Sequence, residues 1–299
     1  MQVNPLHPLF AAEITGADLA APTTPELVAT VEDAMAGYAV CVVRDASLND
    51  ADHIRFSRAF GPLELPPGSS RRAVAPELYD VTNLGPDGEI LPPDPAMAGF
   101  AKGFEKFHTD SSFNALPTKW SLLLGHQVPP EGADTQFVDT RAVYDELPDA
   151  AKRRIEDLVA VHDLYGGRER LGMTNVSAEM RQRYPPVTHP MVRVSASGRK
   201  ALYIGGHAVG IFGWPDDEAR ALLDELFDFA TQDRFVYSHR WAEGDLLIWD
   251  NRCTLHRATP FDRQRYKRDC RRTTINEGGE ERTGFAHLGL AQTQRPLAG

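Results

Sequence analysis

His108-Thr109-Asp110 and Trp249-Asp250-Asn251-Arg252-Cys253-Thr254-Leu255-His256-Arg257-Ala258 are the two stretches that decide the fold. On an extended strand, side chains two residues apart point to the same face, so His108 and Asp110 can reach one metal ion. His256 then has to come from a distant strand that folds back beside them. Two imidazoles and one carboxylate form the facial triad typical of non-haem Fe(II) centres, whereas structural zinc sites favour cysteine. The two stretches therefore predict an iron site on a β scaffold.

Three protein ligands would leave half of an octahedral coordination sphere open. A bidentate 2-oxo acid and O2 can fill the open positions. The sequence has no other His-X-Asp among its 10 histidines, but the tripeptide alone is weak evidence because both residues are common. His162, His189 and His239 have no metal-like spacing, and we expect them to be structural.

A candidate anion-binding strand follows the last of these histidines. In an extended strand over residues 268–275, Arg268 and Arg272 share one face. Two guanidinium groups that face a barrel interior are costly to bury without partners, and arginine suits a bidentate carboxylate. Thr135 is a candidate donor to the same carboxylate as Arg268. The alternatives are two surface arginines paired with acids, and a simple strand-opening turn at Thr135.

Composition limits the class of protein. The chain has 299 residues, of which 42% are hydrophobic and 25% are charged, as in ordinary globular proteins. The net charge of −10 argues against a nucleic-acid partner. There is no apolar run of about 18 residues and no signal-peptide pattern, so we predict a cytoplasmic protein with no membrane partner. Cys41, Cys253 and Cys270 lack CxxC spacing, and we expect reduced thiols.

Helical and strand-like segments alternate along the chain. Thr24-Pro25 predicts a helix start, with threonine as the cap and proline at the first helical position. Apolar spacing predicts further helices at residues 50–60, 149–161 and 215–230. Short β-branched or apolar runs predict strands at residues 37–43, 120–128, 136–139, 191–194, 201–204, 234–241, 245–249, 253–257 and 268–275.

Short strands separated by Gly, Pro and Asp turns favour an antiparallel sandwich or barrel with helices outside. We therefore predict a mainly β fold with flanking helices, in a single domain over residues 1–299. Residues 63–106 and 165–186 are rich in Pro, Gly, Arg and Asp, and we predict that they are long, lid-like loops over a substrate. Plain surface insertions are the alternative. The tail after Gly278-Gly279 carries little pattern.

Eight stretches, distributed from about Pro5 to Thr274, carry a family resemblance. They are Pro5-Leu6-His7-Pro8-Leu9-Phe10, Phe60-Gly61-Pro62-Leu63-Glu64, His108-Thr109-Asp110-Ser111-Ser112-Phe113, Asp134-Thr135, Arg141-Ala142-Val143-Tyr144-Asp145, Ser197-Gly198-Arg199-Lys200, Trp249-Asp250-Asn251-Arg252 and Arg268-Asp269-Cys270-Arg271-Arg272-Thr273-Thr274. On these residues the chain resembles the taurine/2,4-dichlorophenoxyacetate dioxygenase family, and most of all its 2,4-dichlorophenoxyacetate branch. Together the stretches are highly specific.

The resemblance implies a double-stranded β-helix (jelly-roll) core. It also implies a 2-oxoglutarate-dependent non-haem iron dioxygenase that uses Fe(II), 2-oxoglutarate and O2. Position by position, His108, Asp110 and His256 look like the iron ligands. Thr135 and Arg268 look like the partners of the distal carboxylate of 2-oxoglutarate.

The resemblance further implies where a substrate would bind. His207, in Ile204-Gly205-Gly206-His207-Ala208, resembles a contact to the substrate carboxylate, and Arg272 corresponds to a position near co-substrate or the acidic group of the substrate. Asn83 completes the expected substrate-binding set. The expected substrate is a small organic anion, a carboxylate that is hydroxylated. If the target carbon carries an aryl ether oxygen, a phenol and a 2-oxo acid result. We also expect a homo-oligomer.

Other readings stay open. The same chemistry could act on a sulfonate or an amino-acid-like metabolite. From a different class, the chain could be a non-catalytic, metal-binding jelly-roll protein or a zinc hydrolase.

Overall fold

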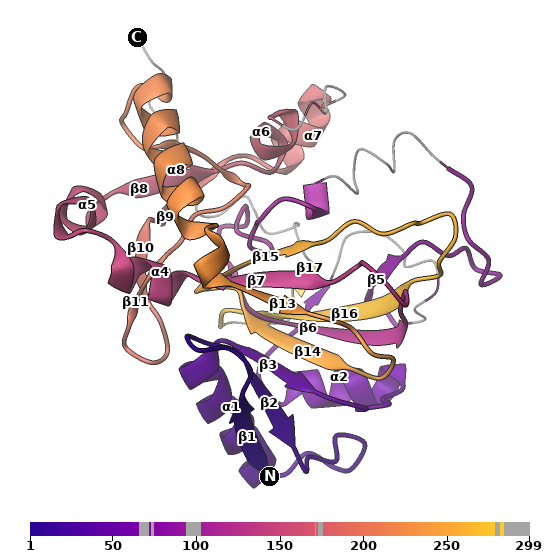
Figure 1. Ribbon diagram of the computed structural model, residues 1–299. Coiled ribbons are helices and arrows are strands. Elements are labelled where there is room, and N and C mark those ends of the chain that lie inside the picture. Colours follow the sequence, from indigo (N-terminus) through magenta and orange to yellow (C-terminus); the bar gives the residue numbers. More distant parts are fainter. Residues whose placement is uncertain are drawn as a thin grey trace.

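The computed structural model describes residues 1–65, 72, 75–93, 103–170, 172, 176–278 and 282–283, and they form a mixed α/β structure with several antiparallel sheets (Figure 1). The largest sheet is seven-stranded and antiparallel except where β2 meets β3. Its order is β1 (Gln2–Pro5), β2 (Ala12–Thr15), β3 (Val40–Val43), β14 (Leu246–Asp250), β6 (Thr118–Gln127), β16 (Asp269–Asn276) and β5 (Tyr79–Thr82). A three-stranded sheet has the order β13 (Val236–His239), β7 (Thr135–Asp139) and β15 (Thr254–Ala258).

Three smaller sheets complete the β structure of the described residues. They are β12 (Ala208–Ile211) with β8 (Val159–His162) and β9 (Val187–Pro190), β10 (Val192–Val194) with β11 (Lys200–Leu202), and β4 (Glu64–Leu65) with β17 (Arg282–Thr283).

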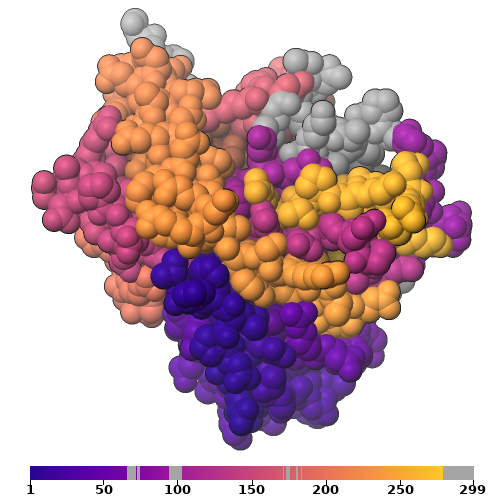
Figure 2. All heavy atoms as spheres, in the orientation of Figure 1, coloured from indigo at the N-terminus to yellow at the C-terminus, as the bar shows by residue number. Residues whose placement is uncertain are grey.

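The period of two along the central strands explains how the large sheet is covered on both faces. Leu122 and Leu124 on β6 pack with α1 (Pro25–Tyr38) and α2 (Asp50–Arg58) in one cluster. The intervening Leu123 points to the other face, where it packs with Phe137 of β7. The seven-stranded and three-stranded sheets thus enclose an apolar core. Figures 1 and 2 show the N-terminal segment, with α1 and α2, at one end of the molecule.

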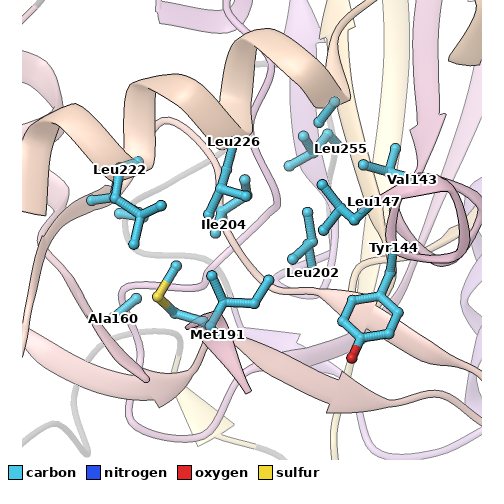
Figure 3. Packing of buried hydrophobic residues seen from close by; sticks show 14 of the residues in the cluster. Val143, Tyr144, Leu147, Ala160, Met191, Leu202, Ile204, Leu222, Leu226 and Leu255 are labelled. Carbon is cyan, nitrogen blue, oxygen red and sulfur yellow. The ribbon is translucent and has the colours of Figure 1, made fainter. Parts of the chain in front are cut away.

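A second core lies under α8 (Asp216–Ala230). Leu222 and Leu226 point from this helix toward Met191, Ile204 and Leu255 in Figure 3. The helices α4 (Thr140–Glu146) and α5 (Asp149–Ile155) border the same cluster. This packing holds β15 from its outer side, and β15 carries one of the predicted metal ligands.

Three predicted helices are confirmed, although the one predicted over residues 50–60 ends at Arg58. The Thr24 hydroxyl accepts from Leu27 N–H and caps α1, and Asn49 caps α2 in the same way through Asp52 N–H. α8 buries the apolar stripe that was predicted for residues 215–230. Among the described helices, none combines the length and the apolar character that crossing a membrane would need.

Two boundary predictions are wrong. The predicted helix over residues 149–161 ends at Ile155, and its second half is strand β8, paired with β9 and β12. The predicted strand at residues 37–43 begins too early, because α1 continues to Tyr38 and Ala39 turns the chain with φ 59°. Both errors come from short apolar runs that suit a helix or a strand equally, so the partner strand decides.

The two predicted long loops contain regular structure. Residues 63–106 include β4 and β5, and β5 extends the large sheet beside β16. Residues 165–186 include most of α6 (Leu164–Glu169) and all of α7 (Ala178–Arg183). These elements are short and depend on distant partners, so the local sequence signals them weakly. Residues 66–71, 73–74, 94–102, 171, 173–175, 279–281 and 284–299 lie outside the described residues. The lid role of the two segments stays a prediction.

Candidate metal centre

The three predicted metal ligands converge. One donor atom from each of His108, Asp110 and His256 lies within 4.8 Å of the others, and all three residues are buried. The backbones of the two histidines form an isolated antiparallel bridge, with N–H···O distances of 2.9 Å and 2.8 Å. This bridge joins the segment before β6 to β15 and therefore sets the spacing of the two imidazoles.

Packing on both faces of β15 orients His256. Leu255 points away from the site and is held in the core under α8 (Figure 3). The alternation of a strand then turns His256 to the inner face. There its ring lies 4.8 Å from the Trp249 ring and 6.0 Å from the Phe137 ring, measured between centroids.

A network of hydrogen bonds fixes Asp110. One carboxylate oxygen accepts from Arg272 Nη1 at 2.6 Å and the other accepts from Ser121 Oγ at 2.8 Å. The Asn251 side chain donates from Nδ2 to Ser121 Oγ at 2.9 Å. Its Oδ1 accepts from Asp110 N–H and from Trp249 Nε1. Each oxygen of the carboxylate keeps a lone pair for a cation.

The protonation states at the site suit metal binding. Burial opposes ionisation of Asp110, but the Arg272 guanidinium beside it holds the pKa of this carboxyl below its usual range. Burial, with the neighbouring His108, lowers the pKa of His256 to about 3. Burial also lowers the pKa of His108. Its Nδ1–H donates to Lys106 C=O at 2.8 Å, which leaves the lone pair of Nε2 free to bind a metal ion. Ionised carboxylate and neutral imidazole are the forms that bind metals.

A cavity of about 580 Å³ opens beside the triad and extends toward α6 and α8. His108, Asp110 and Arg272 line one part of it. Farther out, an apolar and aromatic part of the wall includes Phe113, Leu164, Tyr165 and Tyr184, which pack together in one cluster. Charged residues also line the cavity, namely Lys106, Arg168, Arg170, Arg220 and Asp224.

His207 lies in the wall of this cavity. Its ring centroid is 6.3 Å from that of His108 and 4.9 Å from that of Phe113. Burial lowers the pKa of His207 to about 3, so the imidazole is neutral near pH 7. Gly205, two residues before His207, has φ 148°, and a Cβ there would lie 3.1 Å from Leu255 and 3.4 Å from the His108 Cα. Only glycine allows the chain this close to the metal site.

The two predicted arginines, Arg268 and Arg272, have different partners in the structure. Arg272 is paired with the candidate ligand Asp110 and lies 5.2 Å from the Tyr79 ring centre. Arg268 is buried, its Nε has no hydrogen-bond partner, and it forms no ion pair with a described residue. The Thr135 hydroxyl accepts from Trp241 Nε1 at 3.0 Å, which leaves its own hydrogen to donate. Arg268 and Thr135 lie outside the cavity wall.

Asn83 also lies outside the cavity wall. Its side-chain amide contacts the backbone of residues 263–268 instead. The structure therefore does not bring Asn83 together with His207 and Arg272.

Three residues at the site were missed by sequence reasoning. Ser121 and Asn251 hold Asp110 in place. Of these two, only Asn251 lies in a stretch that carries the family resemblance. Glu64 lines the cavity and accepts from Ser111 Oγ at 3.2 Å. Burial raises the pKa of Glu64 to about 7. Nothing in the local sequence distinguishes Ser121. Glu64 ends a stretch that carries the family resemblance, but its place in the cavity wall comes from distant neighbours and was not predicted.

Comparison with known proteins agrees with this geometry. The family model "Taurine catabolism dioxygenase TauD, TfdA family" matches residues 2–274. An alpha-ketoglutarate-dependent 2,4-dichlorophenoxyacetate dioxygenase of Cupriavidus pinatubonensis is 42% identical over 282 residues, which is 92% of this chain and 97% of that protein. An (S)-phenoxypropionate/alpha-ketoglutarate-dioxygenase of Sphingobium herbicidovorans is 35% identical over 87% of this chain and 90% of its own length.

A solved structure is also similar along most of its length. The crystal structure of AAD-2 in complex with Mn(II) and N-oxalylglycine matches with a TM-score of 0.86 and 39% identity, over 93% of this chain and 99% of that one. A family match over nearly the whole chain, relatives above 30% identity and a buried His-Asp-His set lead to one conclusion. The chain belongs to the taurine catabolism dioxygenase TauD, TfdA family.

Proposed function

We propose that this 2-oxoglutarate-dependent dioxygenase holds Fe(II) through His108, Asp110 and His256 and oxidises aryloxyalkanoate carboxylates. The observation that carries the proposal is the convergence of three buried donors beside an aromatic-walled cavity of about 580 Å³. We also propose that the seven-stranded and three-stranded sheets are the two halves of a double-stranded β-helix. A homo-oligomer stays a prediction, which light scattering tests.

The residues fit the iron ion and the co-substrate. An ionised carboxylate and two neutral imidazoles suit Fe(II), and the absence of cysteine among the donors argues against structural zinc. Arg268, a buried cation without an acidic partner among the described residues, suits the distal carboxylate of 2-oxoglutarate. Thr135 has a hydroxyl hydrogen to donate to the same group. When bound, iron and 2-oxoglutarate supply the oxidising chemistry with O2.

The cavity favours an aromatic acid as substrate. The ring would pack against Phe113, Tyr165 and Tyr184, and His207 would donate a hydrogen bond to the carboxylate from a neutral imidazole. Hydroxylation of the carbon between the ether oxygen and the carboxylate gives a hemiacetal. Its collapse breaks the bond between the hydroxylated carbon and the ether oxygen. It yields a phenol, which keeps the ether oxygen, and a 2-oxo acid, while 2-oxoglutarate and O2 give succinate and CO2.

The related proteins support this substrate class, because their names specify 2,4-dichlorophenoxyacetate and (S)-phenoxypropionate. The alternatives are a sulfonate or an amino-acid-like metabolite with the same chemistry. A solely metal-binding protein and a zinc hydrolase are the alternatives outside the dioxygenases.

A substrate panel tests the proposal. Aryloxyacetates, aryloxypropionates, sulfonates and amino acids are incubated with the enzyme, Fe(II), 2-oxoglutarate and O2, and succinate and phenol are measured. We expect equal amounts of succinate and phenol with aryloxyalkanoates, and loss of both in Asp110→Ala. Anaerobic Fe(II) and 2-oxoglutarate should give a visible charge-transfer band. Zinc hydrolysis would give neither this band nor succinate, and succinate release only with sulfonates would refute the substrate class.

A further inference from the structure

The side-chain amide of Asn83 is fully used in binding the backbone of a single loop. Asn83 directly follows β5 and is 8% exposed. Its Nδ2 donates to Arg263 C=O at 2.8 Å and to Tyr266 C=O at 2.9 Å. Its Oδ1 accepts from Arg268 N–H at 2.7 Å. Both amide hydrogens and the amide oxygen are therefore engaged.

The backbone of Arg268 is held on its other side as well. Its C=O accepts from Asn83 N–H at 3.2 Å and from Thr82 Oγ1 at 2.8 Å. The next residue, Asp269, opens β16, where the register shifts between Asp269 and Cys270. An irregular strand start has a weaker ladder of its own, so the contacts from the end of β5 decide where Arg268 lies.

Without the hydrogen bonds from Asn83 and Thr82, the positive charges in this loop would oppose a fixed position of Arg268. Arg268 is 6% exposed, and its Nε has no hydrogen-bond partner. Burial, and then repulsion from Arg268, lowers the pKa of Arg263 in the same loop. Two neighbouring cations repel each other, and no ion pair with a described residue anchors Arg268. The backbone clamp made by Asn83 and Thr82 supplies the restraint that an ion pair would otherwise give.

We propose that Asn83 is a positioning residue for co-substrate recognition, which sets the Arg268 guanidinium for the distal carboxylate of 2-oxoglutarate. The inference rests on the proposed function, because it needs Arg268 to bind that carboxylate. It replaces a direct contact of Asn83 with the organic substrate. Preorganised donors lose binding strength steeply when their backbone moves, so the effect of Asn83 should act through Arg268 alone.

The test measures co-substrate affinity by anaerobic titration of the Fe(II) charge-transfer band. Two ligands are compared: 2-oxoglutarate and 2-oxopentanoate, which lacks the distal carboxylate. Asn83→Ala should raise the Kd of 2-oxoglutarate by about tenfold, at the lower end of the usual loss for outer partners of a site. The Kd of 2-oxopentanoate and of Fe(II) should not change. Thr82→Val removes one of the five hydrogen bonds, and also the acceptor for Leu84 N–H, and should have a smaller effect in the same direction.

A double-mutant cycle decides whether the effect passes through the arginine. In an Arg268→Ala background, Asn83→Ala should add nothing to the Kd of 2-oxoglutarate. Independent, additive effects would overturn the proposal, and so would a higher KM for the aryloxyalkanoate at an unchanged Kd of 2-oxoglutarate. Equal weakening of both oxo acids would overturn it by showing general damage.

A second variant covers the case in which the alanine protein does not fold. Asn83→Asp keeps the size and the acceptor for Arg268 N–H, but replaces the donors to Arg263 and Tyr266 by a carboxylate oxygen. It should show the same selective loss of 2-oxoglutarate affinity. If the wild type itself gave no band with 2-oxoglutarate, the proposed function would fail before any variant is compared, which separates the two failures.

Discussion

Replacing Arg272 by methionine should destabilise the metal-free protein and do so much less when metal is bound. The guanidinium lies 2.6 Å from Asp110, and the two side chains are 16% and 6% exposed. Removing one partner of such a buried pair costs about 3–5 kcal/mol, because the remaining charge is left unpaired. In domains of about 150–250 residues, about 1 kcal/mol shifts the Tm by about 2–4 °C. We therefore expect the Tm of the metal-free variant to be roughly 6–20 °C below that of the wild type.

A bound divalent cation supplies a positive charge to the same carboxylate. The Tm difference between Arg272→Met and wild type should then fall to less than half in saturating Mn(II), a stand-in that does not react with O2. Differential scanning calorimetry with chelator and with Mn(II) measures both values. The control is Arg199→Met, which removes an exposed ion pair with Asp145 and should change the Tm little in either condition. A Tm difference for Arg272→Met that is the same with and without metal would refute the reasoning.

Three further predictions address the co-substrate, the substrate and the pH dependence of stability. Arg268→Ala should raise the KM for 2-oxoglutarate at least about tenfold more than the KM for the organic substrate; equal effects in steady-state assays would assign the role to another arginine. His207→Ala should weaken carboxylate substrates selectively, and an unchanged ranking of acids in competition assays would remove it from the site. Burial lowers the pKa of His53 to about 3, so only the unfolded state takes up its proton between about pH 6.5 and pH 3, and stability is lost as the pH falls through this window. His53→Gln should reduce the loss between about pH 7.5 and pH 5 by about 2 kcal/mol in urea unfolding, whereas equal losses in both proteins would contradict the assignment.

Much of the candidate site could be read from the chain because its signals are short and local. His108 and Asp110 lie two residues apart, and the prediction that their donors meet is confirmed. The predicted extended strand is not, because His108 lies in an isolated β-bridge and Asp110 in the turn that follows it. Asn83 shows the limit of prediction from local sequence. Contact with substrate was expected, whereas its amide binds the backbone of a loop far along the chain. The partner of a polar side chain depends on what the fold brings beside it.

The sequence by itself determined the elements whose cause is local: the capped start of α1 at Thr24, the apolar stripe of α8 and the identities of the three metal-ligand candidates. Only the tertiary structure decided that residues 159–162 form a strand, because a short apolar run adopts whichever state finds a partner. It also decided that Arg272 neutralises Asp110. Charge pairing and strand pairing depend on contacts between segments that are distant in sequence. The spacing of residues along the chain therefore does not predict them.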